Sequence, residues 1–261
     1  MPDAILKTES VSARFDLQHG GRLSSFILGG KERLIGARDG ATMWGCFPMV
    51  PWAGRVGYGR FQWRDRRVDL PLNLPPHALH GTVFDSTWTQ CDAHHYRANL
   101  GPDWPWPGHV ESTVKLTPGQ MTWTLTVFAH RDSMPVTMGW HPWFARRVAK
   151  QTTATLHFQP RTMFERDASH LPTGAMVTPG HGPFDDCFSG QEPAPRIDWS
   201  DGWSLEVSST CGYWVIYDEP SEGFCVEPQS GPPDAFNQFE YDTVSPAKPL
   251  SHSMTWRWWK R

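Results

Sequence analysis

The sequence has no long apolar run and no recognisable export signal. Nowhere do about 18 apolar residues follow one another, which is the length that a membrane-spanning helix needs. The first ten residues, MPDAILKTES, lack the basic flank and the apolar stretch of a signal peptide. We therefore expect a soluble, cytoplasmic protein that has no membrane partner.

Basic residues are neither in excess nor clustered. Lys and Arg number 24 against 27 Asp and Glu, so the formal net charge is −3. Because nucleic-acid binding usually needs a basic patch, we expect no nucleic-acid partner. A small ligand close to neutral charge fits this balance better.

Paired-cysteine spacings are missing as well. The cysteines at 46, 91, 187, 211 and 225 are odd in number, and none forms a C-x-x-C pair. This pattern argues against a disulfide framework and against a zinc knuckle. We interpret the five cysteines as small buried residues.

No segment shows a helical pattern over three turns, whereas residues that favour strands or end them are abundant. The chain contains 15 Trp, 24 Pro and 23 Gly, a composition that favours β structure. In residues 121–129, MTWTLTVFA, apolar side chains alternate with threonine, which predicts an antiparallel strand with one buried face. Similar alternation predicts strands in RFQWRDRRV (60–68), ATLHFQP (154–160), WSLEVSS (203–209), YWVIYDE (213–219) and SMTWRWW (253–259).

These short strands continue to the end of the chain without a long linker or an internal repeat. Two turn-rich stretches, GPDWPWPGHV (101–110) and PTGAMVTPGHGPFDD (172–186), are predicted to be loops. We expect residues 1–261 to form a single all-β domain, a large antiparallel β-sandwich or barrel.

Several polar residues interrupt aromatic or glycine-bounded segments, where sites are often built on a rigid scaffold. They are His77 and His80 in PHALHG, His141 in GWHPWF, Arg55 in PWAGRVG, Asp185 and Asp186 in PFDDCF, and Glu227 in FCVEPQSGPPDAFN. Each of these residues also has a purely structural explanation. A histidine among tryptophans can be a packed structural residue, and a strand-end glutamate is usually solvated.

Taken in this order, the segments HALHG, GWHPWF, DDCF and VEPQSGPPDAFN resemble those of the aldose 1-epimerase (galactose mutarotase) family. The resemblance implies a β-supersandwich that interconverts the α and β anomers of a free sugar without a cofactor or a metal. It further implies that Glu227 is the general base and His141 the general acid. Sugar hydroxyls would be held by His80, Arg55 and Asp185, with His80 also close to the ring oxygen.

Two positions qualify the resemblance. The family commonly has Asn before the binding Arg, whereas Gly54 stands here, so one amide contact to a hydroxyl is missing. Asp185 fits the acidic position of the motif better than Asp186. Four tryptophans near the motifs are candidates to stack on the sugar: Trp44, Trp52, Trp140 and Trp143.

The chemistry of the anomeric centre requires these residue types. The O1 proton must be removed while the ring oxygen gains one, with a base and an acid on opposite sides of C1. A carboxyl with an ordinary pKa near ~4.3 is ionised at neutral pH, and a histidine near ~6.5 can be protonated. We therefore expect Glu227 to start as a carboxylate and His141 as an imidazolium.

Four alternatives remain open from the sequence. Two His and one carboxylate could be the facial triad of an iron-dependent oxygenase, and two carboxylates could serve a glycosidase. A non-catalytic carbohydrate-binding protein would keep every contact residue. An epimerase of hexose 6-phosphates would need further basic residues, for which Arg64, Arg66 and Arg67 are available.

Overall fold

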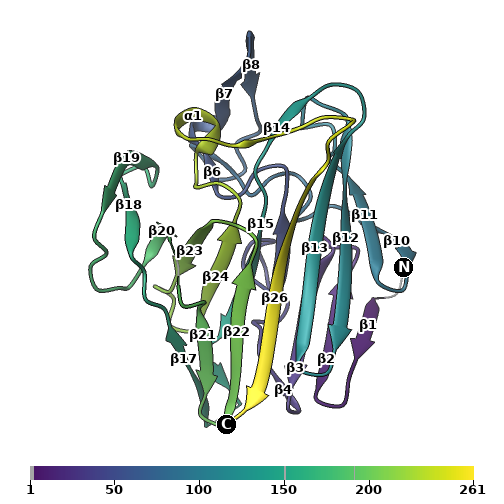
Figure 1. Ribbon diagram of the computed structural model, residues 1–261, viewed down its shortest axis with the longest axis vertical. Coiled ribbons are helices and arrows are strands. Elements are labelled where there is room, and N and C mark those ends of the chain that lie inside the picture. Colours follow the sequence, from purple (N-terminus) through teal and green to yellow (C-terminus); the bar gives the residue numbers. More distant parts are fainter. Residues whose placement is uncertain (1–2, 150, 191) are drawn as a thin grey trace.

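The computed structural model describes residues 3–149, 151–190 and 192–261 of the chain. Within them, two large antiparallel sheets lie over one another as a sandwich, with a small hairpin and a single short helix at one end (Figure 1). The predicted antiparallel all-β sandwich is confirmed. No helix of the described part is both long and apolar enough to cross a bilayer.

The larger sheet runs, in spatial order, through β1 (Ala4–Lys7), β2 (Val11–Asp16), β3 (Arg22–Leu28), β5 (Cys46–Met49), β15 (Gly139–Ala145), β24 (Gly223–Gln229), β23 (Tyr213–Tyr217), β20 (Asp185–Ser189), β18 (Thr162–Arg166) and β19 (Pro172–Val177), and β4 (Lys31–Glu32) pairs with β3. The smaller sheet runs through β10 (Thr89–Asp92), β11 (His95–Asn99), β12 (Gly108–Thr117), β13 (Gln120–Ala129), β26 (Leu250–Lys260), β22 (Trp203–Ser209), β21 (Arg196–Trp199), β17 (Thr152–His157) and β16 (Arg147–Val148).

Three short ladders complete the strand pairing of the described residues. They join β14 (Met134–Val136) to β25 (Asp242–Val244), β6 (Arg55–Val56) to β9 (Ala78–Leu79), and β7 (Arg60–Trp63) to β8 (Arg66–Asp69). Helical structure there is limited to α1 (Ala235–Gln238) and a 3-10 turn, η1 (Gly57–Gly59). The expectation that no helix reaches three turns is confirmed for these residues.

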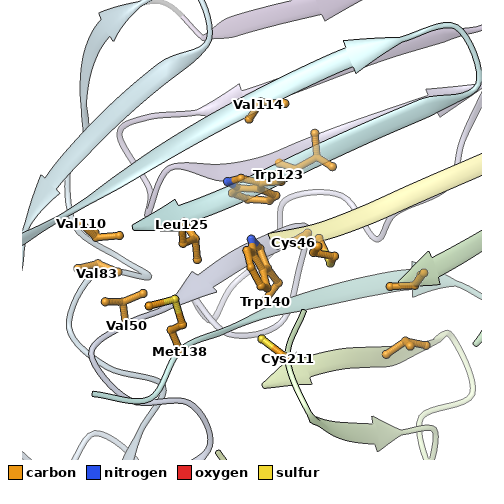
Figure 2. Close-up of a cluster of buried hydrophobic side chains, with 14 of the residues drawn as sticks. Cys46, Val50, Val83, Val110, Val114, Trp123, Leu125, Met138, Trp140 and Cys211 are labelled. Atoms are coloured by element: carbon orange, nitrogen blue, oxygen red, sulfur yellow. The ribbon is translucent and has the colours of Figure 1, made fainter. Parts of the chain in front are cut away.

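The hydrophobic core fills the space between the two sheets. Figure 2 shows Trp123 and Leu125 of β13 directed toward Trp140 of β15. The rings of Trp123 and Trp140 are 6.5 Å apart between centroids and packed edge to face, and both side chains are fully buried. Large rings of this kind bury much apolar area and hold the sheets together.

Side chains of strand β15 pack on both faces of the larger sheet. Successive side chains of a strand point to opposite sides, so Trp140 enters the core between the sheets while His141 and Trp143 project from the outer face of the larger sheet. Trp140 belongs to the main core cluster, and Trp143 packs in a second cluster with Phe47 and Cys225. The GWHPWF segment thus connects the core to the outer face.

The strands predicted from alternation are present, but one predicted strand and both predicted loops differ in part from expectation. The loop predicted at 101–110 ends where β12 begins at Gly108, and the last two residues of the loop predicted at 172–186 begin β20. Residues 60–68 do not form one strand, because Arg64 adopts a left-handed φ of 53° and turns the chain into the β7–β8 hairpin. Residues 172–177, expected to be a loop, form edge strand β19, which pairs only with β18. An edge strand tolerates Pro172 at its first position and needs no alternating buried face.

Gly81 is a position where the fold requires glycine. Its φ is +80°, and an added Cβ would lie 2.0 Å from the carbonyl oxygen of Val50. Gly101 has a similar φ of +77° but open space around it. We expect Gly101→Ala to lower the free energy of unfolding by about 1 kcal/mol and Gly81→Ala by about 3 kcal/mol or more. Urea unfolding of both variants measures this, and equal losses would contradict it.

Candidate functional site

The site is built on the outer face of the larger sheet, where two cross-strand rows of side chains form a floor. His141 and Glu227 lie opposite each other on β15 and β24, between the paired positions Gly139–Gln229 and Trp143–Cys225. The neighbouring row contains Trp143, Cys225, Tyr217 and Asp185 on successive strands. Because the sheet is antiparallel and in register, residues far apart in the chain are adjacent on this floor.

A cavity of about 360 Å³ opens over this floor, a volume within the range of small-molecule sites. All five residues predicted for the site line it, together with other residues from the surrounding loops. The lining residues that matter below are Gly54, Arg55, His80, His141, Trp143, His170, Asp185, Tyr217, Glu219, Glu227, Gln229 and Pro233. The structure therefore brings the predicted set together.

The central contact joins Nε2 of His141 to Oε1 of Glu227 over 3.2 Å. Both side chains are almost wholly buried, and Nε2 of Gln229 donates a hydrogen bond of 3.1 Å to Oε2 of Glu227. This arrangement differs from the expected placement on opposite sides of C1, because the two groups are cross-strand neighbours on one floor. O1 and the ring oxygen are bonded to the same carbon, so adjacent groups suit them.

One wall of the cavity carries a cluster of opposite charges around Asp185. Its Oδ2 lies 3.7 Å from the Arg55 guanidinium and 3.1 Å from that of Arg166. Arg166 also contacts Asp186 at 2.9 Å, and Asp186 does not line the cavity. Asp185 therefore faces the cavity, and its preference over Asp186 as a sugar contact stays a prediction.

His80 is held at the cavity in a strained backbone conformation. Its φ is 60°, in the left-handed region that non-glycine residues rarely adopt. The backbone N–H of His80 donates to the carbonyl oxygen of Gly54 at 3.0 Å, and its ring meets that of His141 edge to face at 4.9 Å. His77 has a structural place instead, because its Nδ1 accepts from the backbone N–H of Tyr58.

The VEPQSGPPDAFN segment has two parts, one that lines the cavity and one that binds a neighbouring loop. Glu227 and Gln229 face the cavity, whereas Asp234 binds the loop that carries Arg55. Asp234 accepts from the N–H of Gly57 at 2.7 Å, and its own N–H donates to the carbonyl oxygen of Arg55 at 2.7 Å. The second part of the motif therefore positions Arg55.

Gly54, which stands where the resemblance implies Asn, lies close to Pro233. It has a φ of +68°, and an added Cβ would lie 3.1 Å from Cβ of Pro233. A side chain at position 54 would therefore require Pro233 to shift by a few tenths of an ångström. Both residues line the cavity.

Burial sets the protonation of the central pair. It raises the pKa of Glu227 well above its ordinary value, and the nearby charge of Asp185 adds to this while Gln229 and Arg55 oppose it. Burial also lowers the pKa of His141 to about 3. Both effects favour the uncharged forms because a buried charge is poorly solvated. The two shifts therefore act against an ion pair at these positions.

These directions oppose the expectation of a carboxylate facing an imidazolium, which used ordinary pKa values. The neutral pair and the ion pair hold the same number of protons, and one proton moved across 3.2 Å converts one into the other. The protonated form of His80 is also disfavoured. Burial, followed by the positive charges of His141 and Arg55, lowers its pKa well below the ordinary value.

Sequence reasoning missed several cavity residues. Gln229 belongs to the EPQ motif and could have been found there, but Glu219, His170 and Tyr217 carry no local signal. Among the four candidate tryptophans, Trp143 lines the cavity, whereas Trp44, Trp52 and Trp140 are buried and do not. Arg64, Arg66 and Arg67 are exposed on the β7–β8 hairpin and its turn, outside the cavity lining.

Only one group of His, Cys, Asp and Glu side chains in the described residues is tight enough to share a metal ion. It consists of His141, Cys225 and Glu227, whose ligand atoms lie within 4.8 Å of one another. His80 is not part of it. The two-histidine facial triad considered from the sequence is therefore not assembled.

The sequence profile of the family described as aldose 1-epimerase matches residues 6–254. The chain belongs to the aldose 1-epimerase family. The uncharacterized protein YphB of Escherichia coli strain K12 is 27% identical to this epimerase-family chain in an alignment of 224 residues, and the match covers 74% of this chain and 76% of YphB.

Solved structures agree with the fold of this family member. A galactose mutarotase-like protein from Clostridium acetobutylicum superposes with a TM-score of 0.86 at 15% identity, covering 98% of this chain and 95% of that one. Galactose 1-epimerase from Lactobacillus acidophilus NCFM superposes with a TM-score of 0.78 at 17% identity, covering 98% and 93%. These likenesses establish the mutarotase-like sandwich.

The raised pKa of Glu227 predicts a pH-dependent stability cost. Above its ordinary pKa of 4.5 the unfolded chain releases the proton that the folded state keeps, so stability falls as pH rises through the raised value. Glu227→Gln removes this cost. We expect the variant to be more stable than the parent at pH 8, with a gap that widens above pH 4.5 by at most about 1.4 kcal/mol per pH unit.

Urea unfolding of parent and variant between pH 4.5 and pH 8 measures this gap. Glu219→Gln is the matched control, because the Glu219 side chain is 48% exposed on the cavity rim and should show no widening gap. A Glu227→Gln protein that is equally or less stable than the parent at every pH would contradict the assigned direction of the shift.

Proposed function

We propose that this protein is an aldose 1-epimerase that interconverts the α and β anomers of a free, uncharged aldose by general acid–base catalysis. The observation that carries the proposal is the contact of 3.2 Å between His141 and Glu227 on the floor of a sugar-sized cavity. Membership of the family and the convergence of Arg55, His80 and Asp185 on the same cavity support it.

In the proposed reaction, Glu227 takes the O1 proton and His141 gives a proton to the ring oxygen. The bond between C1 and the ring oxygen breaks, leaving an open-chain aldehyde. The C1–C2 bond then rotates by half a turn, and the ring closes with both proton transfers reversed. Every proton removed is replaced, so no external acid, base or oxidant is consumed.

The reaction starts from the ion-pair form of the His141–Glu227 pair. Arg55 and the amide of Gln229 both lower the pKa of Glu227 and so oppose the effect of burial. Sugar hydroxyls that donate to the carboxylate would act in the same direction. Arg55, His80 and Asp185 are proposed to hold the hydroxyls, with the edge of Trp143 against the apolar face of the sugar.

Variants at the pair test the proton transfers. Glu227→Gln and His141→Asn each remove one half of the exchange, so we expect kcat to fall about 10²-fold or more while sugar affinity largely survives. Arg55→Ala should mainly weaken binding, because a fixed set of donors is lost. Anomer exchange by NMR and sugar affinity by calorimetry give the two quantities.

A Glu227→Gln protein that exchanges the best substrate at the parent rate would refute the proposed base. A parent protein that binds aldoses in the calorimeter but leaves their exchange at the uncatalysed rate would be the non-catalytic carbohydrate-binding protein instead.

The charge of the cavity bears on the choice between free sugars and sugar phosphates. Its lining carries Asp185, Glu219 and Glu227, but Arg55 is the single Lys or Arg among the described lining residues. Arg55 is already paired with Asp185. The nearby Arg166 contacts Asp185, Asp186 and Glu219, so neither arginine at this part of the described cavity wall is left without a carboxylate partner.

We therefore expect kcat/KM for a neutral hexose to exceed that for its 6-phosphate by about tenfold or more, a difference of about 1.4 kcal/mol in transition-state binding. Parallel NMR exchange measurements on glucose, galactose and their 6-phosphates provide the comparison. Glu219→Gln removes a carboxylate from the cavity rim and should reduce the ratio of kcat/KM for the neutral hexose to kcat/KM for its 6-phosphate. Preference of the parent for a 6-phosphate would reverse the assignment.

A further inference from the structure

Cys225 lies beside the proposed catalytic pair, and the proposed reaction makes no use of it. It is two positions before Glu227 on β24, so both side chains point to the outer face of the sheet. The thiol is fully buried. Trp143 and Tyr217 are its cross-strand neighbours on either side, and their rings contact each other with centroids 5.6 Å apart.

The three neighbouring side chains place one nitrogen, one sulfur and one oxygen close to one another. The ligand atoms of His141, Cys225 and Glu227 lie within 4.8 Å of one another, with His141 and Glu227 3.2 Å apart. Zinc bond lengths of about 2.0–2.3 Å place tetrahedral ligands about 3.3–3.6 Å from one another. Small side-chain movements therefore bring all three atoms to the required spacing.

We propose that His141, Cys225 and Glu227 form a binding site for one borderline-soft divalent cation of the zinc class. Three protein ligands would leave the fourth tetrahedral position open. His141 and Glu227 line the cavity, whereas Cys225 is buried beside them and does not line it. The cation enters from this cavity. Mg²⁺ and Ca²⁺ are poor occupants, since they prefer six or more oxygen ligands and avoid thiolate.

Binding is balanced by the release of protons. The Cys225 thiol forms its bond to the metal as a thiolate and loses its proton to solvent, and the Glu227 carboxyl does the same. His141 is already in the neutral form that ligates metals. No oxidant or reductant is required.

Occupation of this site removes the acid and the base of the proposed reaction at once. The cation therefore inhibits anomer exchange, and a sugar and the cation compete for the cavity. The inhibition rests on the proposed function, whereas binding of the cation does not.

The test uses the full chain, reduced and stripped of metal, titrated with Zn²⁺ in a calorimeter and with Co²⁺ in a spectrophotometer. We expect one equivalent of Co²⁺ to produce the absorption band of a cobalt–thiolate bond, and Zn²⁺ to abolish that band. Cys225→Ser should lose the band and weaken Zn²⁺ binding about 100-fold or more. Cys91→Ser is the matched control, because Cys91 is exposed and distant in the fold.

Inhibition is measured on the same proteins by anomer exchange, each normalised to its own rate without metal. Zn²⁺ should inhibit the parent and Cys91→Ser alike, and inhibition of Cys225→Ser should need about 100-fold more. If Cys225→Ser does not fold, as judged by circular dichroism, loss of the band in His141→Asn serves the same purpose.

Zn²⁺ binding that survives Cys225→Ser and gives no thiolate band would overturn the site and assign the cation elsewhere, for example to the surface pair His109 and His130. Site-specific binding without inhibition would overturn the inhibitory role alone. A parent protein without turnover would refute the proposed function, and the Co²⁺ band would still decide the metal site.

Discussion

The two-residue period of β15 is the constraint on which the site depends. Trp140 is anchored between the sheets against Trp123, so the next side chain, His141, must point away from the core. The pairing of β15 with β24 then places Glu227 directly opposite His141. A slip of one residue would exchange the core and cavity faces of the strand. The large buried tryptophan that stabilises the sandwich therefore also fixes the position of the imidazole.

Much of this architecture could be predicted from local sequence. Alternation in residues 121–129 identified a core strand, and the HALHG, GWHPWF and VEPQ motifs identified three cavity residues that the fold brings together. These predictions succeeded because each depends on a few neighbouring residues. The hairpin at residues 60–68 and the edge strand at 172–177 were missed, because a left-handed Arg64 and a strand paired on one side leave no periodic signal.

Other properties of the site depend on distances that no local pattern contains. The protonation of Glu227 follows from its burial and from the charge of Asp185, which stands on a different strand. The role of Asp234 in holding the Arg55 loop depends on a contact with Gly57 across the fold. The expectation that all five cysteines are buried holds for Cys46, Cys187, Cys211 and Cys225 but is wrong for Cys91, which is exposed on edge strand β10. The approach of Cys225 to His141 required the register of β15 and β24.

The four strands of the cavity floor, in the order β15, β24, β23 and β20, are not all consecutive in the chain. During synthesis, β5 and β15 emerge from the ribosome well before β24. The cavity face of β15 therefore has no partner for His141 until β24 has been made. Pairings of such high contact order form slowly, because much loop entropy is lost before the contacts form. Any activity at this floor would require β24, and fragments ending before that strand would lack the activity.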